Sequence, residues 1–140
     1  MQFDRFEFYR GRADAKYGVW NNYRRQFQFG IKEDSPMLAQ ARLFSRIGKD
    51  AYKTQFRIKR IPENLLDRIK PSPEKPGPRY GVWNAMKKEF QFGICETDPM
   101  VAEARLFYRI EDNARKWRFE IKAIPKDLIP VVRNGRRKGA

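Results

Sequence analysis

The chain has 140 residues, and its 31 lysines and arginines outnumber its 17 acidic residues, giving a formal net charge of +14. Hydrophobic residues make up 41% and aromatic residues 14%, which is enough apolar material for a core and argues against a wholly disordered chain. There is no histidine, so Ser-His-Asp and Cys-His nucleophile systems and histidine-containing zinc sites are excluded. The excess of positive charge favours polyanionic partners.

The single cysteine, Cys95, has no second cysteine for an internal disulfide bond, which is typical of a reducing compartment. The first residues lack the apolar segment of a secretory signal. No apolar run approaches the ~20 residues that a membrane-spanning helix needs. We therefore expect a soluble protein of the cytoplasm.

The chain contains the same segment twice. A shift of 63 positions aligns residues 17–66 with residues 80–129 without a gap, and 28 of the 50 aligned positions are identical. The motifs Tyr-Gly-Val-Trp-Asn and Phe-Gln-Phe-Gly-Ile both recur. Identity at this level indicates a tandem duplication.

The repeat divides the chain into four parts. Residues 1–69 form the first repeat, residues 80–132 the second, and residues 133–140 a basic tail that we expect to be unanchored. Residues 70–79 between the repeats hold four prolines, which favours an extended, semi-rigid linker.

Alternation of apolar and polar residues predicts the strands of the first repeat. They are expected at residues 2–10, 18–21, 26–31 and 53–61. A basic turn at residues 22–25 separates the second strand from the third. Strict alternation in the third strand predicts Phe27, Phe29 and Ile31 on one face.

A helix is predicted between the last two strands of each repeat. It begins at Ser35-Pro36 in the first copy and at Asp98-Pro99 in the second, because Ser and Asp are favoured N-caps and proline suits the first turn. Apolar residues then recur along one face over about three turns. These are Ala39, Leu43 and Ile47 beside Phe44, and Ala102, Leu106 and Ile110 beside Phe107.

Each copy is therefore predicted to be a ββαβ unit, an antiparallel three-stranded sheet with one helix packed on it. The chain as a whole belongs to the α+β class as a tandem duplication of this unit. A unit of ~55 residues is marginally stable alone. We expect the two copies to pack with pseudo-two-fold symmetry, with two units on a proline tether as the alternative.

The predicted helices carry the first candidate site. Arg42 and Arg46 lie four residues apart, and Arg105 and Arg109 repeat the spacing. Like charges at this spacing repel, so their presence in both copies points to an anionic partner. The alternative is a solvated helix face whose arginine stems cover apolar surface.

Two further basic clusters come from the hairpin and the last strand. The hairpin turn carries Arg24 and Arg25 in the first copy and Lys87 and Lys88 in the second. The last strand carries Arg57 and Lys59, with Arg118 and Lys122 in the second copy. Phosphate contacts need positive charge without a strict choice between Lys and Arg, although solubility explains the same pattern.

Aromatic residues are the third candidate. An exposed Trp20 or Trp83 would stack on bases, but a position near a Phe-rich face favours core packing. Tyr108 and Trp117 occur only in the second copy, where they align with Ser45 and Thr54 of the first. That asymmetry suggests a contact that one copy makes and the other lacks.

Catalysis finds little support in the sequence. Glu33, equivalent to Glu96, is the one acidic position that is identical in both copies, and it precedes the helix, where a carboxylate favours the dipole. Metal-dependent phosphate chemistry needs several converging oxygen ligands, and no glycine-rich phosphate loop is present. We expect no enzyme activity, no metal and no cofactor.

A strand ending in Phe29-Gly30-Ile31, followed by a capped helix with Ala39 and Ala41, resembles DNA-binding domains of the AP2 and integrase arm-binding type. The resemblance implies a three-stranded sheet in the major groove with the helix behind it. It assigns the reading face to the hairpin residues Arg24, Arg25, Gln26 and Gln28. The general style is also similar to small accessory proteins of phages and mobile elements.

The leading hypothesis is a non-enzymatic nucleic-acid-binding protein whose duplicated basic surface spans two adjacent backbone segments. The second is a phage or mobile-element inhibitor, anti-CRISPR-like, that binds a host nucleic-acid enzyme or nucleoprotein with Tyr108 and Trp117 as anchors. The third is an assembly subunit whose strand edges pair between chains. DNA and RNA both stay open as partners, as does the oligomeric state.

Overall fold

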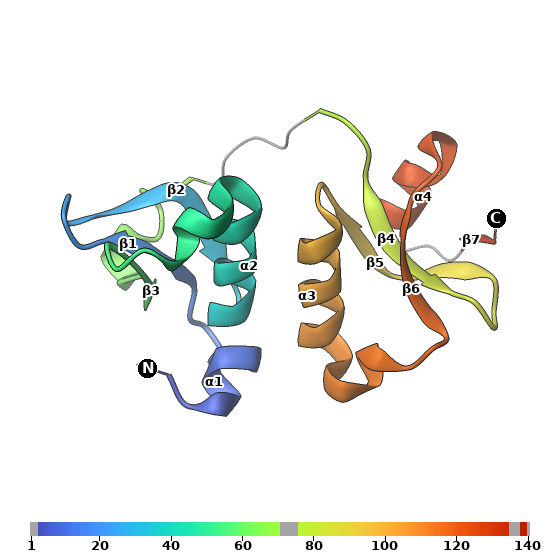
Figure 1. Cartoon of the computed structure of the whole chain (residues 1–140), viewed down its shortest axis with the longest axis horizontal. Helices are drawn as coiled ribbons and strands as arrows, with labels where there is room; N and C mark the ends of the chain where they lie inside the picture. Colours follow the sequence, from blue (N-terminus) through green and yellow to red (C-terminus); the bar gives the residue numbers. More distant parts are fainter. Residues whose placement is uncertain (1–2, 71–75, 135–137, 140) are drawn as a thin grey trace. The chain divides into compact units, whose positions relative to one another are not determined.

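A computed structural model describes residues 3–70, 76–134 and 138–139, and it divides the chain into two compact units. Unit 1 comprises Met1–Pro73 and unit 2 comprises Glu74–Ala140. In each, one helix packs on an antiparallel sheet built around three strands (Figure 1), which confirms the predicted α+β duplication. Half of the predicted linker and half of the predicted tail, at residues 71–75, 135–137 and 140, lie outside the described residues.

The two units repeat the same order of elements, with accessory segments at their ends. Unit 1 contains α1 (Arg5–Arg10), β1 (Tyr17–Asn21), β2 (Gln26–Glu33), α2 (Pro36–Ile47), η1 (Gly48–Tyr52), β3 (Phe56–Arg60) and η2 (Glu63–Leu65). Unit 2 contains β4 (Tyr80–Asn84), β5 (Glu89–Glu96), α3 (Pro99–Ile110), η3 (Glu111–Arg115), β6 (Phe119–Ala123), η4 (Lys126–Leu128), α4 (Ile129–Arg133) and β7 (Lys138–Gly139).

The strand orders are β2-β1-β3 in unit 1 and β6-β4-β5-β7 in unit 2. The strand predicted at residues 53–61 is shorter than expected, because the amide of Phe56 donates to the carbonyl of Lys53 in a turn before β3 starts. β7 pairs with β5, which differs from the unanchored tail that the sequence predicts.

The helix starts follow the predicted capping. Ser35 Oγ accepts a hydrogen bond from the amide of Leu38 at 3.2 Å, and Asp98 Oδ1 accepts one from Met100 at 2.7 Å. A proline follows each cap, so its missing amide costs no hydrogen bond.

The core of each unit lies between its helix and its sheet. Its fully buried members alternate along the central strand and recur every four residues along the helix. They include Val19, Ile31, Ala39 and Leu43 in unit 1, and Val82, Ile94, Ala102 and Leu106 in unit 2. The predicted helix face of unit 1 is confirmed, with Ile47 and Phe44 packing at the edge of the core. In unit 2, Ala102, Leu106 and Ile110 are confirmed as core residues.

The shared glycine of the Tyr-Gly-Val-Trp-Asn motif is required by close approach. A Cβ atom at Gly18 or Gly81 would lie 2.9 Å from the carbonyl oxygen of Ile31 or Ile94. Any side chain would push β1 from β2, or β4 from β5.

A wide bulge interrupts β2, and it overturns the prediction that Phe27 shares a face with Phe29 and Ile31. Two steps along β1 correspond to five along β2, because Tyr17 pairs with Glu33 but Val19 pairs with Gln28. Phe29 and Gly30 both have positive φ, at 70° and 64°. Phe27 therefore packs against Trp20 on the opposite side of the sheet, whereas Phe29 and Ile31 belong to the core under the helix.

The strand predicted at residues 2–10 is wrong, because Arg5–Arg10 form α1. Asp4 is the N-cap and accepts a hydrogen bond from the amide of Glu7 at 2.7 Å. The helix places Glu7 inward with only 6% of its surface exposed. A capping pair three residues apart therefore outweighs the weak alternation within residues 2–10.

Glu7 anchors α1 through a buried polar network. Its Oε2 accepts hydrogen bonds from the hydroxyl of Tyr17 at 2.7 Å and from Arg60 at 2.9 Å, and Arg12 lies 3.5 Å from Oε1. Burial acts to raise the pKa of Glu7, but the two hydrogen bonds and the neighbouring charges outweigh it, so the pKa is lowered. Burial, and then the hydrogen bond to Glu7, raise the pKa of Tyr17.

Candidate nucleic-acid interface

The repeated arginines of the helices serve the scaffold. Arg42 Nε lies 3.1 Å from Glu33 Oε2, and in unit 2 Arg105 lies 3.3 Å from Glu96. Both side chains are only about a quarter exposed, at 26% and 27%. Because each pair ties the helix to the strand before it, the recurrence of these residues has an intramolecular cause.

The second arginine of each pair contacts the bulge. Arg46 donates to the carbonyl of Phe29 at 3.3 Å, and Arg109 donates to that of Phe92 at 3.0 Å. These carbonyls belong to the residues with positive φ. The four-residue spacing of the arginines therefore also has an intramolecular explanation, because the second arginine of each pair donates a hydrogen bond to the bulge.

The hairpin tips present the second predicted cluster to solvent. Arg24, Arg25, Lys87 and Lys88 are all exposed. In each turn the side chain of one asparagine sets the conformation: Asn21 Oδ1 accepts from the amides of residues 23 and 24, at 2.9 and 3.1 Å, and Asn84 does the same in unit 2.

Sequence reasoning missed these asparagines. Both are nearly fully buried, and each also donates to a glutamine on the neighbouring strand, Gln28 or Gln91. An asparagine directly before a turn, identical in both copies, is the signal that indicates this role.

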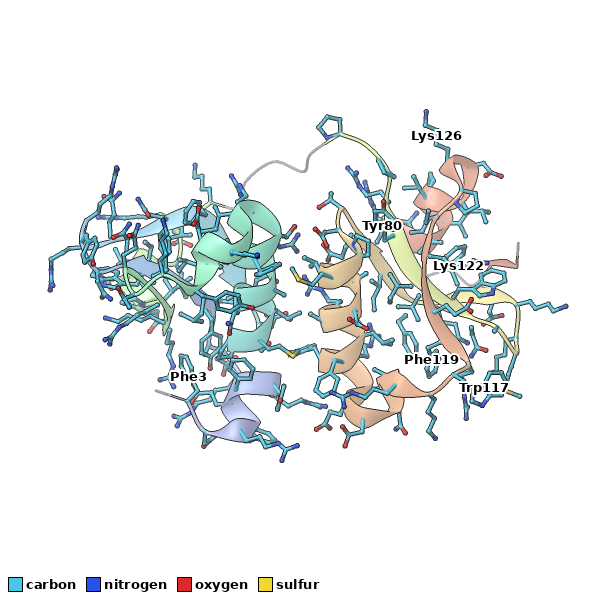
Figure 2. All side chains as sticks on the ribbon, in the orientation of Figure 1. Phe3, Tyr80, Trp117, Phe119, Lys122 and Lys126 are labelled. Atoms are coloured by element: carbon cyan, nitrogen blue, oxygen red, sulfur yellow. The ribbon has the colours of Figure 1, made fainter. Side chains whose placement is uncertain are left out.

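The side of each sheet away from α2 or α3, here called the outer face, carries a tryptophan beneath a lysine. The Lys59 ammonium lies 4.8 Å from the centre of the Trp20 ring, and Lys122 lies 4.8 Å from that of Trp83. Figure 2 shows Lys122 on the side of β6 opposite Phe119, which packs against the core.

Both tryptophans are half-buried and lie outside the core under the helix. Each packs edge-on against a phenylalanine, Trp20 on Phe27 and Trp83 on Phe90, with ring centres 5.1 Å apart. The tryptophans therefore differ from the predicted core packing: they are half-buried in an aromatic layer on the outer face, and only Trp83 packs against a buried cluster. This layer leaves one side of each indole for the lysine.

The remaining strand cations differ between units. Arg57 is exposed and pairs across the sheet with Trp20, but the equivalent position in unit 2 is Glu120. Arg118 precedes β6 and is half-buried, with its guanidinium 5.9 Å from the ring centre of Phe119. The outer face of unit 1 is therefore more positive than that of unit 2.

The two aromatic residues unique to unit 2 have different surroundings. Trp117 is 74% exposed, whereas Tyr108 is half-buried on α3. Trp117 is thus the larger unpacked surface of the two, and Figure 2 shows it at the start of β6.

Among the described residues, no group of His, Cys, Asp and Glu could hold a metal ion. In the same part of the chain, no helix is long and apolar enough to cross a membrane. Cys95 is half-buried, and its sulfur lies 3.9 Å from Arg133.

Comparison with known proteins finds matches to both units. The family described as "YoqE prophage protein" matches residues 15–60 and 78–123, more than half of the chain. The SPbeta prophage-derived uncharacterized protein YoqE of Bacillus subtilis (strain 168) is 51% identical over 45 residues, which are 32% of this chain and 83% of that protein. That relative is therefore about the size of one unit.

No solved structure matches the chain. The family match confirms the predicted phage or mobile-element character. The resemblance to AP2 and integrase arm-binding domains gains no support from these comparisons and stays a prediction.

Proposed function

The chain belongs to the YoqE prophage protein family, and from this premise we propose that it is a non-enzymatic phage protein that binds nucleic acid. The binding surface consists of the hairpin tips of both units and the part of each outer face that carries the tryptophan and lysine pair. One observation carries the proposal: a lysine stacked on a tryptophan recurs at 4.8 Å in both units, beside a tip with two exposed cations.

The distribution of unpaired charge favours the hairpin tips over the helices as the site of phosphate contact. Arg42 and Arg105 are already paired with carboxylates, so a phosphate would have to compete with an intramolecular ion pair. The four tip cations are exposed instead. Each phosphate that such a side chain neutralises releases counterions, which provides sequence-independent affinity.

The exchange of Arg24 and Arg25 for Lys87 and Lys88 fits phosphate contact, because it keeps the charge and changes the shape of the donor. Two such surfaces in one chain bind a polymer more tightly than one, since the second contact becomes intramolecular.

The test is binding of the nuclease-treated protein to short labelled DNA and RNA across a salt series, measured by fluorescence anisotropy. A variant with alanine at Arg24, Arg25, Lys87 and Lys88 should bind more weakly. On duplex DNA, the slope of log K against log salt should flatten by about 0.9 for each side chain that contacts a phosphate.

The matched control removes the same number of charges from other exposed positions, namely Lys49, Arg68, Lys70 and Lys126. It should leave most of the salt slope intact. Equal loss in both variants would reduce the effect to net charge and overturn the assignment to the tips.

Membership of a prophage family also favours a second candidate, an inhibitor of a host nucleic-acid enzyme such as a CRISPR nuclease. In that case the basic surface binds an acidic patch on the enzyme or its nucleoprotein complex. This candidate predicts no binding to free DNA or RNA even at low salt, and a stoichiometric complex with the enzyme that survives nuclease treatment.

A further inference from the structure

The hairpin end of unit 2 exposes two large apolar side chains, whereas unit 1 exposes one at the equivalent positions. Trp117 is 74% exposed and Met86 is 61% exposed. The equivalent positions in unit 1 are Thr54 and Tyr23, of which Tyr23 is 74% exposed. Unit 1 therefore presents one apolar side chain here, and unit 2 presents two.

The register of the sheet brings these positions together. β4 and β6 pair Asn84 with Phe119, and the amide of Ala85 then donates to the carbonyl of Arg118 at 2.7 Å. That bond lies one step beyond the ladder, and Met86 and Trp117 are the neighbours of its two residues, so both lie at the hairpin end of the sheet. An equivalent bond from Asn22 to Gln55, also 2.7 Å, has Tyr23 and Thr54 as its neighbours in unit 1.

Positive charge borders this end of the sheet. Lys87 and Lys88 follow Met86 in the turn, and Lys116 precedes Trp117; all three are exposed. An exposed indole beside several cations has the two components of a single-strand site, a flat ring for a base and charges for the adjoining phosphates.

We infer that Trp117 stacks on an unpaired base and makes the hairpin end of unit 2 a site for single-stranded nucleic acid. Bases in a duplex are stacked on each other and offer no free face to an indole, so the contact discriminates against duplex. The inference rests on the proposed function, because stacking adds to an electrostatic contact made by the tips.

The chain supplies its own matched variants. Trp117→Thr introduces the residue that the equivalent position in unit 1 already holds, so the fold accommodates it, and circular dichroism checks this. Trp117→Phe keeps an aromatic face. Thr54→Trp places an indole at the same position in unit 1.

Binding is measured with oligo(dT), oligo(U) and a duplex of equal length, by anisotropy and by quenching of tryptophan fluorescence. Trp117→Thr should weaken binding to the single strands at least about fivefold, the smallest effect expected from loss of one stacked base. Duplex binding should not change, Trp117→Phe should retain most of the affinity, and Thr54→Trp should raise single-strand affinity. The two oligomers distinguish DNA from RNA as the preferred strand.

An unchanged single-strand affinity in Trp117→Thr, or an equal loss on duplex, would overturn the stacking role. If the tip variant still weakens binding in that case, the proposed function stands without it. Absence of binding by the wild-type protein to all three probes would overturn both proposals.

Discussion

Unit 1 and unit 2 share a sheet, a bulge and a helix, but each is completed by a different segment. In unit 1, α1 packs against α2 and inserts Glu7 beneath Tyr17. In unit 2, α4 packs against β5 on the outer face. There it closes a second apolar cluster formed by Phe90, Ile124, Leu128 and Val132.

The repeated ββαβ core therefore leaves part of its surface unburied, and a helix outside this core packs on it in each unit. Units of this size bury a smaller fraction of their surface on folding than larger domains do, so one added helix matters. Tyr80 corresponds to the fully buried Tyr17 but is only partly buried, and among the described residues of unit 2 no helix takes the place of α1 beside it. Each unit buries part of this surface with a different segment, α1 in unit 1 and α4 in unit 2.

The largest expected effect comes from removing the polar anchor of unit 1. Glu7→Ala should destabilise unit 1 by about 2 kcal/mol, since a buried hydrogen-bonded carboxylate is lost while Arg60 and Arg12 can turn to water. Hydrogen exchange of the Val19 amide in β1 reports unit 1, and that of Val82 in β4 reports unit 2. An equal loss of protection at both valines would contradict a local role for the network.

A smaller effect should appear on acidification. The pKa of Glu7 is lower in the folded chain than its ordinary value of 4.5, so its contribution is fully present above about pH 4.5. It is lost as the pH falls through the folded value, because protonation then favours the unfolded state. Amide resonances of β1 should weaken in this range through a component absent from Glu7→Gln. The same acid response in that variant would assign it to other carboxylates.

The smallest expected effect concerns the residues that end α2 and α3. Gly48 ends α2 with φ of 64°, whereas Glu111 ends α3 with φ of 54°, a conformation that costs little only for glycine. Glu111→Gly should therefore stabilise unit 2 by about 1 kcal/mol, and Gly48→Ala should destabilise unit 1 by at least about 1 kcal/mol, because alanine must then adopt the positive φ. Urea unfolding followed by hydrogen exchange measures both. Destabilisation by Glu111→Gly would show that the contacts of the glutamate outweigh its backbone strain.

Sequence predicts what is determined locally. The helix starts at Ser35 and Asp98 are predictable because the capping oxygen and the amide that donates to it lie within three residues of each other. The fold class is predictable because the duplication displays the same pattern twice.

What sequence misses depends on distant contacts. The Asp4 cap that starts α1 is local, but Glu7, which anchors that helix to the sheet, has its partner Arg60 53 positions away. The face of Phe27 depends on a bulge that its own alternation does not reveal. The arginines of the helices look available for a partner until Glu33 and the Phe29 carbonyl are seen beside them.

The buried asparagine at each hairpin has a consequence for how the two copies can diverge. Its side-chain oxygen accepts hydrogen bonds from the amides of the second and third residues after it, and these bonds fix the turn. The turn residues themselves are therefore free to vary, and Asn-Tyr-Arg-Arg at 22–25 has become Ala-Met-Lys-Lys at 85–88 without one identity. A gene duplication on such a scaffold allows one loop to acquire a new specificity while the other keeps the old.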